Sequence, residues 1–190
     1  DEAWKAATAY PFVREMDRQR ADPYYPTDVR LVWTPNGGVT VGYRCTEPFA
    51  GDETIRKKIR EMGSVEILDT FLDVSAAGDG HYCQIYLEDD ARPVYYTDGP
   101  NWSGKGVEAA VWFGRDEWFA EIYIPFAAIT DLPQAQFPEG TSSGGKFWLG
   151  NFCRSRVWDS RLPKAERREG SKRESSRRYT RYSIWNKDPA

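Results

Sequence analysis

The chain has 190 residues, a length that favours one domain over residues 1–190 with a substantial hydrophobic core. Hydrophobic residues make up 40% and charged residues 29%, which excludes a disordered or collagen-like chain, and the apolar runs are far shorter than the roughly 20 residues of a membrane helix. Eleven of the 26 basic but only four of the 29 acidic residues lie between Arg154 and Tyr182, so this segment carries +7 while the rest carries −10. An acidic body without a recognised nucleic-acid motif argues against nucleic acid as a partner.

Short strands follow one another through most of the chain, because apolar and polar residues alternate. Val29–Trp33 and Val39–Cys45 flank Asn36-Gly37, a dipeptide typical of a β-hairpin. Apolar residues at helical spacing predict a short helix over Ile55–Met62. Further strands are predicted at Val65–Asp73, His81–Glu88, Pro93–Thr97, Val107–Phe113, Glu117–Ile124, Lys146–Arg154 and Tyr179–Trp185.

This order of elements predicts an all-β fold, an antiparallel β-sandwich of jelly-roll type with one or two short helices. The polar, charged stretch at about 155–178 lacks periodicity and is predicted to be an irregular basic loop. Trp112 faces away from the core, so its burial needs a covering loop or helix. The residues predicted to face the core are Val39, Val41, Tyr43, Ile85, Leu87, Val107, Ala109, Val111, Phe113, Trp118, Ile122 and Ile124.

The motifs that could indicate catalysis are incomplete. Gly140–Gly144 spells GxSxG and Gly140–Lys146 approaches a phosphate-binding loop, but a strand pattern follows both where a helix is required. His81 is the only histidine, and alternation places it on a strand. We therefore expect that the protein is not an enzyme. The three cysteines, Cys45, Cys83 and Cys153, form no CxxC pair. We interpret them as small hydrophobic residues on strands, or as one disulfide and a free thiol.

A series of short motifs runs in order along nearly the whole chain. The motifs are Asp1–Trp4, Thr27–Trp33, Val41–Pro48, Glu66–Asp73, His81–Tyr86, Trp118–Phe126, Phe147–Arg154 and Tyr182–Trp185. Their order and spacing resemble family 9 carbohydrate-binding modules and their DOMON-like relatives. The resemblance implies a jelly-roll-like sandwich that binds polysaccharide or oligosaccharide without catalysis, often with structural calcium, within a secreted glycan-processing protein.

A pyranose ring presents an apolar C–H face and a rim of hydroxyls, so its binding site needs an aromatic surface beside polar groups. Aromatic residues make up 15% of the chain, and Tyr82, Gln84 and Tyr86 project from one side of a predicted strand. The resemblance places Asp69 at the position of the family's sugar-binding acid. Trp102 and Trp158 are either ligand platforms or loop anchors. The predicted carbohydrate-binding residues are Asp69, Gln84, Tyr86, Trp102, Asn151, Arg154 and Trp158.

Three other functions stay open. Paired carboxylates are plentiful enough for a small glycosidase, although no acid and base are singled out among Glu66, Asp69, Asp73, Glu88, Asp89 and Asp90. Well-known family members carry a Trp shortly before the acidic motif, whereas this chain has Met62-Gly63-Ser64 there, which fits a structural or interaction domain without sugar binding. A haem-binding DOMON-like domain would use Met and His as axial ligands, and those residues are Met16, Met62 and His81. The carboxylates identify no metal site, so calcium is implied by the resemblance alone.

The charge of the chain and its first residues add expectations about partner and location. The basic segment Arg154–Tyr182 favours anionic glycans over neutral ones, because accumulated positive charge attracts polyanions. The chain opens on Asp1-Glu2-Ala3-Trp4 without a charged-then-apolar leader, which fits a mature form or an excised domain. The resemblance to family 9 modules implies an extracellular or cell-surface location, and the short apolar runs predict no membrane span.

Overall fold

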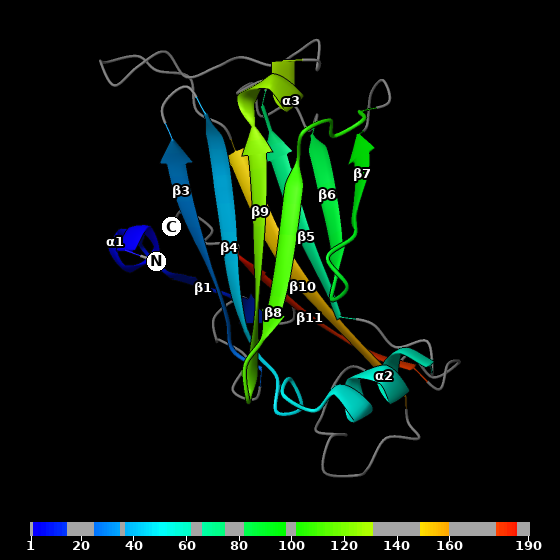
Figure 1. Ribbon diagram of the computed structural model, residues 1–190. Coiled ribbons are helices and arrows are strands. Elements are labelled where there is room, and N and C mark those ends of the chain that lie inside the picture. Colours follow the sequence, from blue (N-terminus) through cyan, green and yellow to red (C-terminus); the bar gives the residue numbers. More distant parts are fainter. Residues whose placement is uncertain are drawn as a thin grey trace.

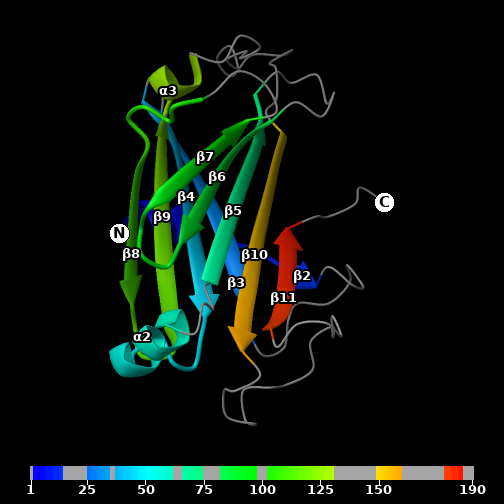
Figure 2. The same ribbon diagram turned by 90° about the vertical axis from the view of Figure 1, so that its right-hand side faces the viewer.

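Two antiparallel sheets packed face to face build the protein (Figures 1 and 2). The computed structural model describes residues 2–14, 25–34, 37–61, 66–74, 82–97, 102–130, 149–159 and 178–185. The antiparallel sandwich that the alternation predicts is confirmed. No helix among the described residues is long and apolar enough to cross a membrane.

Sheet A has five strands and contains the hairpin predicted around Asn36-Gly37. β3 pairs with β4 from Thr27 opposite Cys45 to Thr34 opposite Gly38, and β4 pairs with β9 over its whole length. In spatial order the strands are β1 (Tyr10–Pro11), β3 (Thr27–Thr34), β4 (Gly38–Thr46), β9 (Glu117–Pro125) and β8 (Glu108–Phe113).

Sheet B has six strands, and β10 and β5 lie in its middle. Most of its strands begin and end within two residues of their predicted bounds, and β7 has the predicted bounds themselves. In spatial order the strands are β2 (Val13–Arg14), β11 (Arg178–Trp185), β10 (Leu149–Asp159), β5 (Glu66–Asp73), β6 (Cys83–Glu88) and β7 (Pro93–Thr97).

β10 continues to Asp159, five residues beyond its predicted end at Arg154. The predicted irregular loop is therefore wrong for residues 155–159, and residue 178 already belongs to β11. The rest of that stretch, 160–177, lies outside the described residues. β10 pairs with β5 as far as Arg156 and with β11 as far as Asp159. Backbone hydrogen bonds to a neighbouring strand hold a strand even where its side chains are charged, and alternation within the sequence does not reveal such a neighbour.

Three short helices accompany the sheets: α1 (Glu2–Ala6), α2 (Glu53–Glu61) and α3 (Phe126–Thr130). α2 confirms the predicted helix, and Asp52 caps it by accepting a hydrogen bond from the Ile55 N–H at 3.0 Å. α2 lies at one end of the sandwich and α3 at the other (Figure 1). The sequence did not predict α1 and α3, because a five-residue helix carries too little periodicity to be recognised.

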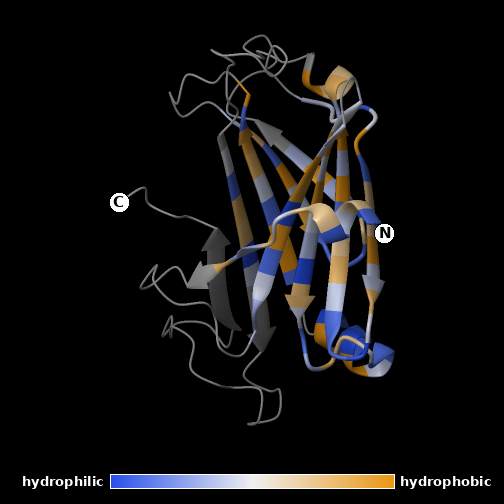
Figure 3. Ribbon diagram, turned by 90° about the vertical axis from the view of Figure 1, so that its left-hand side faces the viewer, coloured by the Kyte–Doolittle hydropathy of each residue, from blue (hydrophilic) through white to orange (hydrophobic). Residues whose placement is uncertain are grey.

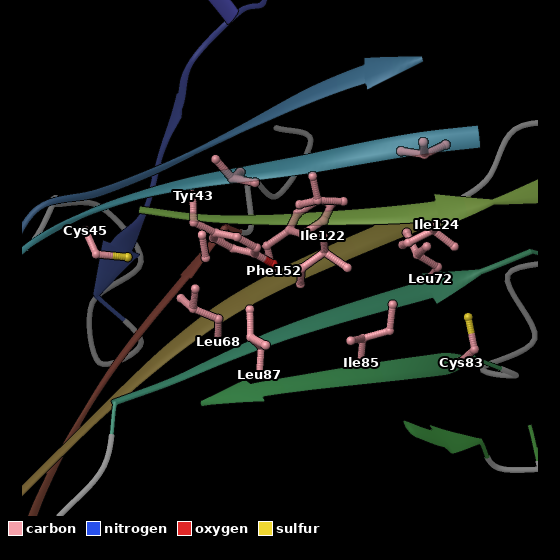
Figure 4. Packing of buried hydrophobic residues seen from close by; sticks show 14 of the residues in the cluster. Tyr43, Cys45, Leu68, Leu72, Cys83, Ile85, Leu87, Ile122, Ile124 and Phe152 are labelled. Atoms are coloured by element: carbon pink, nitrogen blue, oxygen red, sulfur yellow. The ribbon is translucent and has the colours of Figure 1, made fainter. Parts of the chain in front are cut away.

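The hydrophobic core fills the space between the inner faces of the two sheets (Figure 4). Tyr43, Ile122 and Ile124 of sheet A are buried against Leu68 and Phe152 of sheet B. Apolar and polar residues alternate along the strands (Figure 3), so each strand turns one side to this core. The predicted inward residues of β4, β6 and β9 are buried, whereas those of β8 and its preceding residue are half-buried because β8 is an edge strand.

The three cysteines are free thiols, which confirms that they are strand-borne hydrophobic residues and excludes the disulfide. Cys45 and Cys83 are buried. Burial raises the pKa of Cys45 to about 12, so this thiol stays protonated and unreactive at neutral pH.

An arginine is buried within the sandwich. Arg154 of β10 is only 2% exposed, and its Nε donates to Glu66 Oε2 on β5 at 2.8 Å. Its Nη1 donates to Thr27 Oγ1 at 3.0 Å and to the Thr46 carbonyl oxygen at 3.1 Å, both on sheet A, while Nη2 lies 3.9 Å from Glu47 Oε2. Desolvation lowers the pKa of Arg154, but the attraction of Glu66 and Glu47 outweighs it and raises that pKa overall. One charged guanidinium therefore bonds both sheets.

Arg154→Ala is expected to lower the free energy of unfolding by about 3–5 kcal/mol, because the buried Glu47 and the largely buried Glu66 would lose their shared cation. Urea unfolding followed by tryptophan fluorescence measures this loss. Arg92→Ala is the control, since the Arg92 side chain is 81% exposed and pairs with Asp90 at the surface, so its removal should barely change stability. Equal stabilities of the two variants would contradict a bridging role for Arg154.

Candidate functional site

Three of the predicted site residues share the outer face of sheet B. Burial alternates along β5, so Leu68 and Thr70 face the core while Asp69 faces outward. The same alternation on β6 turns Gln84 and Tyr86 outward. Backbone pairing sets Asp69 opposite Tyr86, and Gln84 lies one outward position further along β6. The structure therefore brings Asp69, Gln84 and Tyr86 together, as the sequence predicted.

Asp69 and Gln84 are directly hydrogen-bonded, with Gln84 Nε2 donating to Asp69 Oδ1 at 2.6 Å. Burial raises the pKa of Asp69 above its ordinary value, and the hydrogen bond from Gln84 lowers it by a smaller amount. A half-buried carboxylate on the outside of a sheet costs desolvation energy that folding alone does not require. Groups with perturbed pKa values of this kind are candidates for a functional site.

Asn151 and two aromatic rings extend this surface. Asn151 of β10 lies opposite Phe71 of β5, which lies opposite Gln84 of β6, so the three form a row across the sheet. Asn151 is exposed, Tyr82 is 38% exposed, and the Tyr82 ring meets the Phe71 ring edge to face at 5.4 Å. We name this surface the Asp69–Gln84 face; its members are Asp69, Phe71, Tyr82, Gln84, Tyr86 and Asn151. Polar groups and aromatic rings lie side by side on it, as a polyhydroxylated ligand requires.

Arg154 does not belong to this surface, contrary to the prediction. Asn151 and Arg154 are three positions apart on β10, so their side chains leave opposite sides of the strand. Asn151 is exposed, whereas Arg154 bonds Glu66 and Thr27 inside the core. The motif match suggested a shared site, but the period of two along a strand separates the two residues. Arg154 therefore belongs to the fold.

Trp102 is a buried loop anchor and no ligand platform. It is 6% exposed, and its Nε1 donates to the Ala128 carbonyl oxygen at 2.6 Å. Its ring meets that of Tyr95 edge to face at 5.4 Å. The same loop contains Gly104 at a φ of +58°, where a Cβ would lie only 2.4 Å from the Tyr95 ring. Tight packing of this loop accounts for the tryptophan without a ligand.

The other predicted ligand-binding groups lie partly or wholly outside the described residues. The backbone of Trp158 is in β10, opposite Tyr179, but its side chain is outside the described part of the structure. Met16, Met62 and His81, the residues considered for haem, are outside it altogether. Within the described residues, no three His, Cys, Asp or Glu side chains come together as a group that could hold a metal ion.

Sheet A carries a surface feature for which the sequence predicted no site. A pocket of about 340 Å³ lies on its outer face between Trp4 of α1 and Trp112 of β8. Two sequence signals point to it. Gly42 lies in the middle of a strand, where glycine marks the close approach of another group, and Trp112 alternates away from the core. α1 partly supplies the cover that Trp112 needs, although Trp112 remains 43% exposed.

The fold of this chain is similar to that of solved carbohydrate-binding modules, whereas its sequence has no recognised relatives in two further comparisons. No family model and no curated protein matches the sequence. A solved carbohydrate binding module of family 9 from Caldicellulosiruptor kristjanssonii in complex with cellotriose matches at 11% identity and a TM-score of 0.52, covering 97% of this chain and 75% of that chain. One from the same organism in complex with glucose matches at 12% identity and a TM-score of 0.50, covering 97% and 77%. The predicted resemblance to the fold of this family is confirmed.

Gln84→Ala is expected to raise the pKa of Asp69 further, because the lost hydrogen bond stabilises the charged carboxylate. The folded-state pKa already exceeds the unfolded one, so this carboxyl costs stability as the pH rises through that range, and the variant should lose more stability than the native chain. Carbon-13 NMR titration of the Asp69 carboxyl and urea unfolding at matched pH values measure both effects.

The control for this titration is Val94→Ala, since Val94 is 43% exposed and lies opposite Tyr86 on β7. It should leave the pKa of Asp69 where it is in the native chain. An Asp69 pKa that is unchanged or lowered in Gln84→Ala would show that the hydrogen bond does not control the charge of this carboxyl.

Proposed function

We propose that this protein binds carbohydrate without catalysis, through the Asp69–Gln84 face of sheet B. The observation that carries the proposal is the 2.6 Å hydrogen bond between Gln84 and Asp69 on a surface that also holds the Tyr82 and Phe71 rings. Further support comes from the fold, which is similar to two family 9 modules solved in complex with cellotriose and with glucose.

The Asp69–Gln84 pair keeps most of its hydrogen-bonding capacity. A carboxylate accepts several hydrogen bonds and a side-chain amide offers two donors and an acceptor, while the pair itself uses one donor and one acceptor. A sugar hydroxyl can donate to Asp69 and accept from Gln84 at the same time. Because the two side chains already hold one another in place, a ligand loses little free energy in ordering them.

The carboxylates on this side of sheet B already have side-chain partners. Asp69 accepts a hydrogen bond from Gln84 at 2.6 Å, and Glu88 accepts one from the Tyr86 hydroxyl at 3.4 Å. Glycoside hydrolysis needs one carboxyl group as acid and a second as base or nucleophile beside the scissile bond. We propose binding because these contacts hold Asp69 and Glu88 as hydrogen-bond acceptors.

We also propose an extracellular setting, in a secreted glycan-processing protein. The series of motifs shared with family 9 modules supports this setting. The thiols are compatible with it, because Cys45 and Cys83 are buried and the pKa of Cys45 is raised to about 12, which protects it from oxidation.

Asp69→Ala and Gln84→Ala are each expected to weaken glycan binding about tenfold or more, since a lost buried hydrogen bond to a ligand costs about 1–3 kcal/mol. Calorimetric titration with cellotriose and a panel of other neutral and acidic oligosaccharides measures the affinity. Asp116→Ala is the matched control, because Asp116 is an exposed carboxylate in the turn between β8 and β9. Unchanged affinity in both site variants would move the site elsewhere, and release of reducing ends would overturn non-catalytic binding.

The charge of the glycan is a second part of the proposal. The segment Arg154–Tyr182 carries +7 against −10 for the rest of the chain, which supports binding of uronate-bearing or sulfated chains. Arg154 itself is buried and paired with Glu66, so its charge does not contribute to such attraction. The preference would therefore come from the other ten basic residues of the segment.

Replacing Arg167, Arg168, Arg177 and Arg178 together by Gln is expected to weaken binding of acidic glycans and to flatten its salt dependence. Attraction between exposed charges is screened beyond about 8 Å at physiological salt, so a charge-driven affinity falls as salt rises. Titrations of one neutral and one sulfated oligosaccharide at low and high salt measure both quantities. Equal, salt-independent binding of the two glycans by the native chain would exclude a role for the segment's charge.

A further inference from the structure

The pocket on the outer face of sheet A lies on the opposite side of the sandwich from the Asp69–Gln84 face, and the strands that carry it are in front in Figure 1. It encloses about 340 Å³, which is within the range of small-molecule sites. We name it the Trp4–Trp112 pocket. Its lining combines three aromatic rings with charged side chains: Trp4, Trp112, Phe119, Arg44, Glu117 and Glu121.

α1 supplies one wall of this pocket. The Trp4 ring lies directly over Gly42, where a Cβ would approach Trp4 Cη2 to 2.7 Å. Trp4 Nε1 donates to Glu121 Oε1 at 2.5 Å, and Arg30 Nη1 donates to the Trp4 carbonyl oxygen at 2.7 Å. Ring, indole N–H and backbone are thus all held by sheet A. A wall that is already in place loses little entropy when a ligand binds.

β8 and β9 supply the second wall. Trp112 and Phe119 lie opposite each other on the two strands, and their rings stack with centroids 5.4 Å apart and planes inclined by 11°. The stack fixes the Trp112 ring, yet this side chain remains 43% exposed. A rigid, partly open indole is what a stacking ligand needs.

Four of the five charged groups that line the pocket form two ion pairs, and the fifth, Glu121, accepts from the Trp4 indole. Arg44 Nε donates to Glu117 Oε2 at 2.6 Å, and Arg30 Nε lies 3.5 Å from Asp28 Oδ1. Both signs of charge are therefore present in fixed positions and largely compensate each other. The surface offers strong donors and acceptors without a large net field.

This combination favours a neutral polyhydroxylated ligand. An apolar ligand would remove water from Arg44 and Glu117 without replacing its hydrogen bonds. A highly charged ligand would meet groups of its own sign as well as the opposite one. A saccharide can donate hydroxyls to the carboxylates, accept from the guanidinium groups and place its C–H face on the Trp112 indole.

We propose that the Trp4–Trp112 pocket binds a neutral saccharide unit, which gives the protein two glycan-binding surfaces on opposite faces of the sandwich. The two proposals share no residue, so either can fail alone. A domain with two such surfaces holds two segments of glycan at once. Binding of the first segment raises the effective concentration of the second, so weak sites act together on a polysaccharide.

NMR titration of the nitrogen-15-labelled full chain with glucose, cellotriose, xylotriose and mannotriose at millimolar concentrations tests the pocket. The indole N–H signals of Trp4 and Trp112, assigned from their Ala variants, should shift and saturate with at least one of these sugars. In Trp112→Ala, the affinity for that sugar, followed at the Trp4 signal, should fall about tenfold because the stacking surface is gone. Gly42→Ala should also weaken binding, since its Cβ displaces the Trp4 wall.

Trp33→Ala is the matched control, because Trp33 is 45% exposed but lies outside the pocket, with its ring 4.5 Å from that of Phe126 and tilted by 48°. It should leave the affinity at the Trp4 signal unchanged. The double variant Asp69→Ala/Gln84→Ala should leave it unchanged too, which separates this pocket from the Asp69–Gln84 face. The proposal is overturned if no sugar of the panel shifts the two signals, or if Trp112→Ala binds as tightly as Trp33→Ala.

Discussion

The Arg154 guanidinium joins the two sheets from inside the sandwich, with Glu66 on β5 and Thr27 on β3 among its partners. Such a group tolerates little displacement, because a buried charge that loses its partner costs several kcal/mol. Its bonds therefore fix how one sheet lies over the other. The inward direction of the Arg154 and Glu66 side chains also determines which residues lie on the outer surface. Asn151 is three positions from Arg154 on β10, and Asp69 is three positions from Glu66 on β5, so both point outward.

The two outer faces of the sandwich hold their polar groups in different ways. On sheet B, Asp69 is half-buried and its pKa is raised by desolvation, with an amide from Gln84 as its hydrogen-bond donor. On sheet A, Glu117 accepts from Arg44, and Glu121 accepts from the Trp4 indole. On sheet B, a hydroxyl group that donates to Asp69 would therefore stabilise its charged form. On sheet A, the paired side chains keep unused donors and acceptors in fixed positions beside the aromatic rings.

The sequence predicted what depends on neighbours along the chain and missed what depends on distant partners. Alternation together with the Asn36-Gly37 turn predicted the β3–β4 hairpin, and alternation predicted the outward direction of Gln84, because these signals are local. The Gln84–Asp69 bond needs the register between β5 and β6, which no local pattern defines. The continuation of β10 and the seating of Trp4 on Gly42 likewise depend on pairing across the sheets. Arg154 is a different case: it lies three positions from Asn151, so the period of two along a strand already places the two side chains on opposite sides, although both belong to one motif.

Exposed aromatic rings do not by themselves define a binding surface, and the two most exposed tryptophans among the described residues illustrate why. Trp33 and Trp112 are 45% and 43% exposed, and each has an aromatic neighbour, Phe126 and Phe119 respectively. Only Trp112 lies in a pocket where ionised side chains such as Arg44 are fixed by their own pairs. A sugar needs both the aromatic ring and the fixed polar groups. Stacking on the ring removes water from its C–H face, and its hydroxyls must then exchange water for other hydrogen-bond partners. The exposed area of the ring is therefore less informative than the hydrogen-bonding groups held beside it.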